Sequence, residues 1–204
     1  MTQAQTAARK KTRRATRPLR IVFLLTLAMI ALITVAYFGN RFFEKRTYRL
    51  LYPEEIVTYS LEYQLNPQLT AAVIQVESAN RSQVVSPKGA VGLMQIMPAT
   101  GAWIAENMGM DDYREDRLTD PAVNIQMGCW YLRYLLDMFE NENTAVAAYN
   151  AGPGKVKQWL KDERYASDGA LCSIPYEETE RYVKKVAAAK EKYAELYEKE
   201  LSRQ

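Results

Sequence analysis

The sequence predicts an all-α protein, in which a single helical domain follows one N-terminal transmembrane helix. Three observations support this fold class. An uncharged apolar run occupies residues 21–38. Beyond it, apolar residues recur at helical spacing, with no convincing alternation of the kind that marks β-strands. Helix starts are marked twice by an N-cap residue followed by proline, at Asn66-Pro67 and Asp120-Pro121.

The apolar run reads IVFLLTLAMIALITVAYF. Eighteen helical residues span about 27 Å, which fits a bilayer core. A cleaved signal peptide is the alternative, but its apolar region is normally about 7–15 residues and ends in a small-residue cleavage site, which we do not find near Tyr37. We therefore expect an uncleaved anchor in the cytoplasmic membrane. Because the larger cluster of basic residues precedes the run, we expect a cytoplasmic N-terminus and a folded domain on the outer side.

Composition divides the chain into four segments. We expect a basic cytoplasmic tail over residues 1–20, the transmembrane anchor over 21–38, a stem over 39–53 and a folded domain over 54–204. Of the 27 Lys and Arg residues, 20 lie beyond residue 20 together with all 24 Asp and Glu residues, so that part of the chain has a net charge of −4. No basic stripe remains in the folded part, which argues against nucleic-acid binding.

Histidine is absent from the chain, and there are only two cysteines, Cys129 and Cys172. The lack of histidine excludes Ser-His-Asp and Cys-His catalytic sites and His-ligated zinc. The cysteines form no CxxC pair, and we expect no metal and no cofactor. They are either a disulfide outside the membrane or two buried small apolar residues.

The first strong helix signal of the domain predicts a helix over residues 67–78, with Leu69, Val73 and Val76 on one face. The next segment, residues 86–101, is rich in glycine and proline. It predicts turns with a short helix, a second helix from Pro98, and a shape suited to a cleft wall.

Asp120-Pro121 begins a longer helix through Phe139, which we expect to be central and buried. Residues 176–201 predict a long charged helix, whose outer part from residue 190 we expect to be solvated. The spacing of Trp103, Trp130 and Trp159 favours positions in the core.

Glu77 is the strongest candidate for a chemical role. It follows Val73 by four positions, so it lies at the edge of the apolar face near the end of its helix. Burial there disfavours the charged carboxylate and raises the pKa, as a proton donor near neutral pH requires. Spacing alone leaves an ordinary surface glutamate as the alternative.

Several motifs around Glu77 occur in a characteristic order. Together they resemble the catalytic domain of the soluble lytic transglycosylases, over about residues 55–190. The resemblance implies a lysozyme-like helical domain of the goose type. Its motifs are Glu77-Ser78, Gly92-Leu93-Met94-Gln95, Ala148-Tyr149-Asn150-Ala151-Gly152, Ile174-Pro175, Glu178-Thr179 and Tyr182-Val183.

The resemblance also implies a role for each matching residue. Glu77 would be the catalytic acid and then base. Ser78 would support the local geometry of Glu77. Ser86 and Gln95 would contact the sugar or its N-acetyl group, and Met97 would line the cleft. Tyr149 and Asn150 would hold the reacting sugar and the carboxyl, and Glu178 and Tyr182 would close the far wall. Each has a structural alternative, such as a turn at Ser86, packing at Met97 or a helix cap at Asn150.

The implied substrate is the glycan strand of peptidoglycan. Glu77 would protonate the bond between N-acetylmuramic acid (MurNAc) and N-acetylglucosamine (GlcNAc), and would then take a proton from the muramoyl C6 hydroxyl to form a 1,6-anhydro ring. One alternative is a hydrolytic lysozyme with Asp111, Asp112 or Glu178 as a second carboxylate. Another is a non-catalytic peptidoglycan-binding scaffold.

Overall fold

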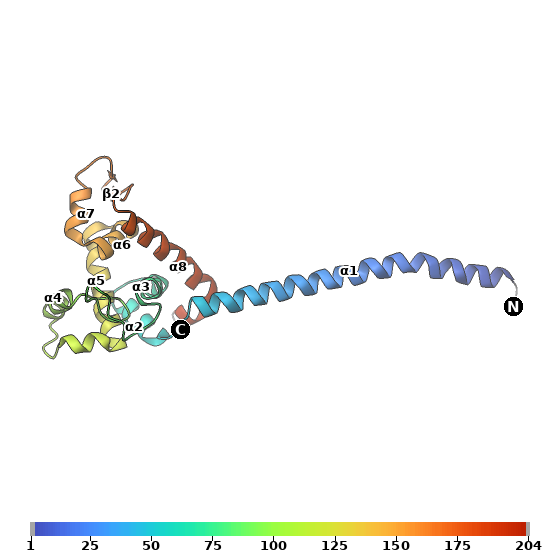
Figure 1. Ribbon diagram of the computed structural model, residues 1–204, viewed down its shortest axis with the longest axis horizontal. Coiled ribbons are helices and arrows are strands. Elements are labelled where there is room, and N and C mark those ends of the chain that lie inside the picture. Colours follow the sequence, from blue (N-terminus) through green and yellow to red (C-terminus); the bar gives the residue numbers. More distant parts are fainter. Residues whose placement is uncertain (1–2, 203–204) are drawn as a thin grey trace. The chain divides into compact units, whose positions relative to one another are not determined.

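The computed structural model describes residues 3–202 and, from residue 20 onward, their side chains (Figure 1). It divides into two compact units, one up to Thr47 and one from Tyr48. The second unit is mostly helical, which confirms the all-α prediction. The side chains of the expected basic tail lie outside the described residues, apart from Arg20.

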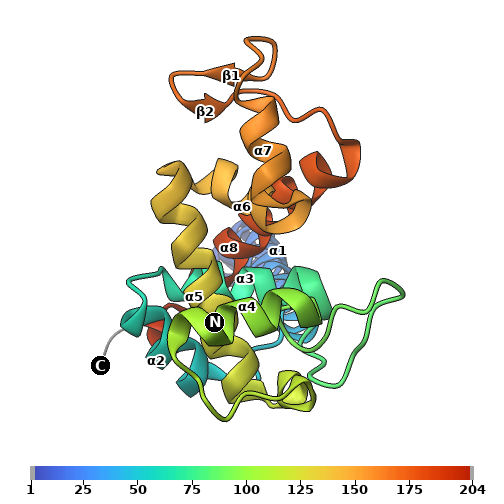
Figure 2. The same ribbon diagram turned by 90° about the vertical axis from the view of Figure 1, so that its left-hand side faces the viewer.

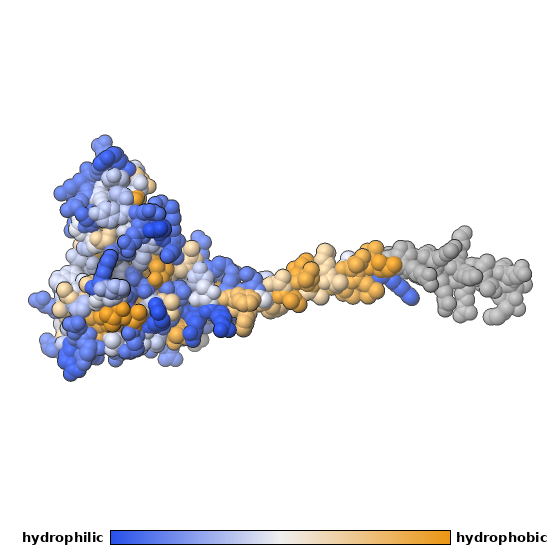
Figure 3. Space-filling model, viewed as in Figure 1, coloured by the Kyte–Doolittle hydropathy of each residue, from blue (hydrophilic) through white to orange (hydrophobic). Residues whose placement is uncertain are grey.

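The first unit is a single helix, α1 (Gln3–Thr47), which continues through the first part of the expected stem. Its segment Arg20–Thr47 is long and apolar enough to cross a membrane, as judged by length and composition. The large apolar side chains between residues 21 and 38 are exposed, and Figure 3 shows them as a nearly continuous apolar surface. In water such a surface is costly, because apolar groups are more stable away from water.

The second unit contains seven α-helices, one 3₁₀ helix and one small hairpin within the described residues. They are α2 (Pro53–Glu62), α3 (Pro67–Ser78), α4 (Pro98–Met108), η1 (Glu115–Thr119), α5 (Pro121–Phe139), α6 (Glu142–Ala151), α7 (Pro153–Trp159), β1 (Ala166–Ser167), β2 (Ala170–Leu171) and α8 (Glu177–Leu201). The strands pair antiparallel. Figure 2 shows α2 to α5 grouped at one end of this unit, with α6, α7 and the hairpin at the other.

Helix α3 begins and ends where its sequence dictates. The Asn66 side chain accepts a hydrogen bond from the backbone N–H of Gln68 at 2.8 Å, and Pro67 occupies the first turn. The helix ends at Ala79, whose φ of 51° is left-handed. Leu69, Val73 and their neighbours are buried, and the predicted bounds 67–78 are confirmed.

Helix α5 also follows its prediction. The Asp120 side chain accepts a hydrogen bond from the N–H of Ala122 at 2.9 Å, and the helix runs to Phe139. It contacts α2, α4, η1 and α6, so it is the central element of the unit. Cys129 is buried within it, as one of the two alternatives expected. Cys172 is instead exposed and both residues are free thiols, so neither a disulfide nor a pair of buried cysteines is present.

Helix α8 lies along α3 and also contacts α6 and α2, so it joins the two ends of the unit (Figure 1). The expectation that its outer part is solvated is wrong. Tyr193, Leu196, Tyr197 and Leu201 are all buried, because Leu196 and Tyr197 follow Tyr193 by three and four positions and Leu201 follows Tyr197 by four, the spacing of one apolar face. Tyr193 also donates a hydrogen bond to the carbonyl of Arg49 at 2.7 Å.

The segment between α3 and α4 forms turns and two isolated bridges, Val85 with Val91 and Val91 with Ile96. The short helix expected here is absent from this described segment, and the helix from Pro98 is confirmed. Buried Asn124 of α5 explains the difference. It accepts from the N–H of Met94 at 2.8 Å and donates to the carbonyls of Val91 at 3.0 Å and Leu118 at 2.8 Å. These contacts replace the bonds that a helix would make within itself.

Candidate active site

The candidate site lies where the end of α3, the start of α8, the end of α6 and the turn segment before α4 meet. Glu77 is in the last turn of α3 and is partly buried. Tyr182 of α8 donates a hydrogen bond from its phenol to Oε1 of Glu77 at 2.6 Å. The sequence led us to expect that Tyr149 and Asn150 contact this carboxyl, whereas in the structure the hydrogen bond comes from Tyr182.

Burial raises the pKa of Glu77 from its ordinary value of 4.5 to about 7, while the hydrogen bond from Tyr182 acts in the opposite direction. The raised pKa has a clear physical origin, because an ionised carboxylate loses its hydration when it is covered by protein. The negative end of the α3 dipole disfavours the carboxylate as well. Glu77 is therefore protonated in a large share of molecules at neutral pH.

Tyr149 of α6 holds the turn segment against the site. Its phenol donates to the carbonyl of Met94 at 2.8 Å. Burial and then the negative charge of Glu77 raise the pKa of Tyr149 well above its usual value, and the same two causes act on Tyr182. Both phenols therefore stay protonated and act as hydrogen-bond donors beside the carboxyl.

Gln95 is fixed by its own segment. Its side-chain amide donates to the carbonyls of Gly92 at 2.9 Å and Val84 at 3.2 Å. Its φ of 49° is left-handed, as are the φ values of Ala79 and Asn80 directly after α3. Each such non-glycine residue costs about 1–3 kcal/mol, and strained backbone of this kind concentrates at functional sites.

Two glycines allow the turn segment to pack this closely. A Cβ on Gly92 would lie 2.3 Å from the carbonyl oxygen of Leu118, and φ at Gly92 is +81°. A Cβ on Gly128 of α5 would lie 2.2 Å from the sulfur of Met94. Glycine is therefore required at position 92, where backbone is in the way, whereas a side chain at position 128 would have to displace the Met94 side chain.

The other predicted residues are placed as follows. Ser78 is buried and donates to the carbonyl of Ile74 at 3.1 Å, so it contacts its own helix. The Ser86 hydroxyl accepts from the N–H of Ala90 at 2.9 Å, which is the turn-shaping contact. Met97 is 42% exposed and precedes α4.

Asn150 and Glu178 lie at the junction of α6 and α8. Thr179 donates to Oδ1 of Asn150 at 2.8 Å, and Asn150 therefore bonds α8. Gly152, and not Asn150, is the N-cap of α7. Glu178 is exposed and lies one turn before Tyr182, on the same face of α8.

Sequence reasoning missed Asn124, and it named Thr179 within a motif without giving it a role. Both are fully or almost fully buried polar residues, and each holds an element of the site through a side-chain hydrogen bond. Asn124 had a detectable signal, since it is a polar residue between Val123 and Ile125 in a helix that the sequence predicts to be buried. Among the side chains that the structure describes, no group of three or more cysteine, aspartate or glutamate residues could hold a metal ion.

The profile of the transglycosylase SLT domain family matches residues 55–171, more than half of the chain. The chain therefore belongs to this family, as the sequence motifs indicated. The matched region includes Glu77, the turn segment and Tyr149, and it ends before α8, which carries Tyr182.

Relatives with known names share the same region. The soluble lytic murein transglycosylase of Salmonella typhimurium is 39% identical over 143 residues, which cover 68% of this chain and 22% of that protein. The membrane-bound lytic murein transglycosylase C of Actinobacillus pleuropneumoniae is 32% identical over 158 residues, or 66% of this chain and 43% of that protein. The chain thus matches about a fifth of the length of the first relative.

Solved structures agree with this assignment. The 70-kDa soluble lytic transglycosylase of Escherichia coli superposes with a TM-score of 0.71 at 34% identity, over 78% of this chain and 26% of that one. The lytic transglycosylase Slt of Pseudomonas aeruginosa, solved as an inactive mutant with a glutamate replaced by glutamine, has a TM-score of 0.67 at 35% identity. That match covers 72% of this chain and 24% of that one. The lysozyme-like fold is thereby confirmed.

Proposed function

We propose that the domain is a peptidoglycan lytic transglycosylase. It cleaves the β-1,4 bond between MurNAc and GlcNAc and leaves a 1,6-anhydro-MurNAc end, with Glu77 as acid and then base. One observation carries the proposal: a partly buried carboxyl group with a pKa of about 7, held by the phenol of Tyr182. The transglycosylase relatives, one of them inactive after a glutamate-to-glutamine change, support it.

The reaction uses one carboxyl group twice, first as acid and then as base. Protonated Glu77 donates its proton to the glycosidic oxygen as the bond from that oxygen to C1 breaks. The 2-acetamido group stabilises the positive charge at C1. The Glu77 carboxylate then takes the proton of the C6 hydroxyl as the C6 oxygen bonds to C1. Glu77 ends protonated, no water is consumed, and Tyr182 stabilises the carboxylate between the two steps through its hydrogen bond.

The surroundings of Glu77 favour this one-carboxyl mechanism over hydrolysis by a second carboxylate that attacks the sugar, since the two carboxyl groups of such enzymes are about 5–5.5 Å apart. A second carboxylate within about 6 Å would raise the pKa of Glu77 further by charge repulsion. Among the described side chains, no carboxylate contributes to the raised pKa. The alternatives suggested by the sequence are poorly placed to help, since Asp112 pairs with Arg117, and Asp111 and Glu178 are exposed.

In this proposal the remaining predicted residues contact the substrate or support those that do. Gln95 and Met97 contact the glycan strand, and Ser86 shapes the turn segment that carries Gln95. Tyr149 and Asn150 border the reacting sugar, and Glu178 lies at the outer edge beside Tyr182. Ser78 stabilises the end of the helix that carries Glu77.

Digestion of purified sacculi by the full chain in detergent tests the function. The wild type releases soluble muropeptides that are lighter by one water than products with a reducing end. Glu77→Gln releases almost none, and Glu106→Gln, which changes an exposed glutamate near the end of α4, behaves as the wild type. Reducing-end products would point to the hydrolytic lysozyme. Equal release by wild type and Glu77→Gln would favour the non-catalytic scaffold.

We further propose that α1 anchors the protein in the cytoplasmic membrane, with the N-terminus inside and the domain on the cell-wall side. The apolar surface of residues 21–38 and the basic residues before it support this arrangement. Cys172 is an exposed thiol of the domain, whereas Cys129 is buried. A membrane-impermeant maleimide should therefore label intact spheroplasts at Cys172, and Cys172→Ser should abolish the label. Labelling only after lysis would contradict the orientation.

A further inference from the structure

Four aromatic rings of α4 and α5 form a cluster that the protein covers only in part. Trp103 contacts the rings of Trp130, Tyr131 and Tyr134, with centroids 5.5, 6.3 and 5.1 Å away. Trp130 and Tyr134 are stacked, with an interplanar angle of 5°. The sequence placed Trp103 and Trp130 in the core. Trp103 is instead 37% exposed, and Trp130 is partly exposed as well.

A pocket of about 320 Å³ opens on this cluster. Its lining comprises Ala99, Thr100, Trp103, Tyr131, Tyr134 and Pro153. The first turn of α4, the middle of α5 and the start of α7 therefore form its walls. Its volume is near the lower end of the range of about 300–1,000 Å³ for small-ligand pockets.

The lining has the chemistry of a sugar-binding site. One face of a β-linked pyranose ring presents only C–H groups, which pack on the flat face of an aromatic ring, while its hydroxyls point outward from the edge. Trp103, Tyr131 and Tyr134 offer such faces. The hydroxyl groups of Thr100 and the two tyrosines offer polar atoms around them.

The pocket is next to the candidate active site, because one of its lining residues, Tyr131, contacts Tyr149 of that site. The ring of Tyr131 lies 5.5 Å from that of Tyr149. Tyr149 in turn bonds the carbonyl of Met94 and is close enough to Glu77 for the carboxylate charge to raise its pKa, after the larger effect of burial. Ala99 and Thr100 follow Met97 directly in the chain. A chain of sugars that reaches Glu77 would thus extend naturally to Trp103.

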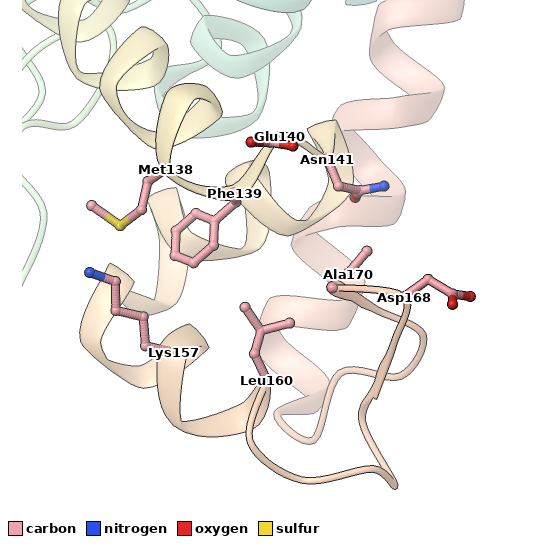
Figure 4. Close-up of a pocket in the computed structure, with 9 residues that line it drawn as sticks. Met138, Phe139, Glu140, Asn141, Lys157, Leu160, Asp168 and Ala170 are labelled. Carbon is pink, nitrogen blue, oxygen red and sulfur yellow. The ribbon is translucent and has the colours of Figure 1, made fainter.

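A larger pocket, of about 440 Å³, lies at the far end of α5 and has different chemistry (Figure 4). Phe139 is its one aromatic lining residue. Figure 4 shows the charged side chains of Lys157 and Asp168 on opposite sides of Phe139 and Leu160. This lining lacks the stacked rings of the Trp103 pocket.

We propose that the Trp103 pocket binds a pyranose ring of the glycan strand, one or more sugars away from the bond that is cleaved, with Trp103 as the stacking residue. This inference rests on the proposed function, because it takes the glycan strand as the ligand. In this proposal the pocket makes longer glycan strands bind more tightly and takes no part in proton transfer.

Binding of GlcNAc oligomers tests the proposal without turnover. The full-length Glu77→Gln protein serves as the parent, and tryptophan fluorescence reports binding of the GlcNAc hexamer and dimer. We expect the parent to bind the hexamer more tightly than the dimer. Trp103→Leu should weaken hexamer binding about tenfold and reduce the advantage of the hexamer over the dimer. It should also remove most of the fluorescence change.

Two controls keep the result interpretable. Trp159→Phe changes a buried tryptophan that packs on Tyr176 at 5.0 Å, and should leave hexamer affinity and the fluorescence change intact. Tyr134→Leu removes another wall of the pocket, and should weaken hexamer binding in the same direction as Trp103→Leu if both variants retain the parent's melting temperature.

The two proposals fail in different ways. Unchanged hexamer affinity in folded Trp103→Leu would overturn the subsite, even if the wild type digests sacculi to anhydro products. Conversely, a wild type that leaves sacculi intact would overturn the proposed function, while the oligomer measurements would still show whether the pocket binds sugar.

Discussion

Glu77 and Glu178 belong to the same set of motifs, yet the structure gives them very different surroundings. Glu77 lies in the last turn of α3, is partly buried and accepts a hydrogen bond from Tyr182. Glu178 lies in the first turn of α8, one turn before that tyrosine, and is exposed. Burial raises the pKa of Glu77 to about 7. The comparison teaches that burial, more than membership of a motif, prepares a carboxyl group to donate a proton.

The largest expected effect is on the activity of Glu77→Gln. An amide has no acidic proton to donate, and positioned acid–base catalysis is worth about 10²–10⁴-fold. We expect a loss of turnover of at least this size, with glycan binding retained. Muropeptide release from sacculi measures the rate, and binding of the variant to sacculi in a pull-down measures affinity. A variant with more than a tenth of wild-type turnover would contradict the acid role.

The same variant should change stability in a pH-dependent way. Below pH 4.5 Glu77 is protonated in both the folded and the unfolded chain. As the pH rises towards 7 the unfolded chain ionises first, so the wild type loses stability and the loss is complete above pH 7. From pKa values of 4.5 and about 7, the loss is at most about 3 kcal/mol.

Glu77→Gln has no such penalty. We therefore expect it to gain stability relative to the wild type as the pH rises from 4.5 to 7, with a gain of at most about 3 kcal/mol that then stays constant. Denaturant unfolding of both full-length proteins at pH 5 and pH 8 measures this difference. A difference in stability that is equal at the two pH values would contradict the buried state of the carboxyl.

Tyr182→Phe should shift the pH dependence of kcat/KM, and this shift identifies the role of Tyr182 better than the decrease in kcat does. Its hydrogen bond lowers the pKa of Glu77, so removing the phenol raises that pKa further. The fall of kcat/KM at high pH should therefore move to higher pH, and kcat should decrease about tenfold. Tyr193→Phe is the matched control, because it removes another buried phenol of α8 and should leave the pH profile in place.

Glu178→Gln should have the smallest effect. An exposed carboxylate at the edge of a binding site contributes about 0.2–1 kcal/mol, so we expect kcat/KM to fall by a factor of about 1.4 to 5, through KM. Anhydro products should persist. A loss as large as that of Glu77→Gln would give Glu178 a catalytic role and would restore the two-carboxylate alternative.

Much of the fold was predictable, because local signals and tertiary packing agree along α3 and α5. The Asn66-Pro67 and Asp120-Pro121 starts and the apolar spacing sufficed for both helices. The hairpin of residues 166–171 was missed, since two-residue strands are too short to show alternation. The short helix expected before α4 is replaced by turns, because Asn124 bonds the backbone there from 30 residues away.

The sequence motifs selected residues that lie together in the candidate site, but they did not predict the contacts among these residues. Motifs identified Glu77, Tyr149 and Tyr182, but the hydrogen bond from Tyr182 joins residues 105 positions apart and depends on how α8 packs along α3. The exposure of Trp103 likewise depends on how helices pack against one another. Its helical spacing predicted burial, and only the arrangement of α4, α5 and α7 leaves the pocket beside it open.

The ionisation of Glu77 itself tests the central claim most directly. Carboxyl ¹³C NMR of the full chain in micelles, with the signal assigned by its absence in Glu77→Gln, follows that group alone. The structure predicts that the signal titrates at about pH 7. Titration near the ordinary value of 4.5 would show a solvated carboxylate at neutral pH and would contradict its role as proton donor.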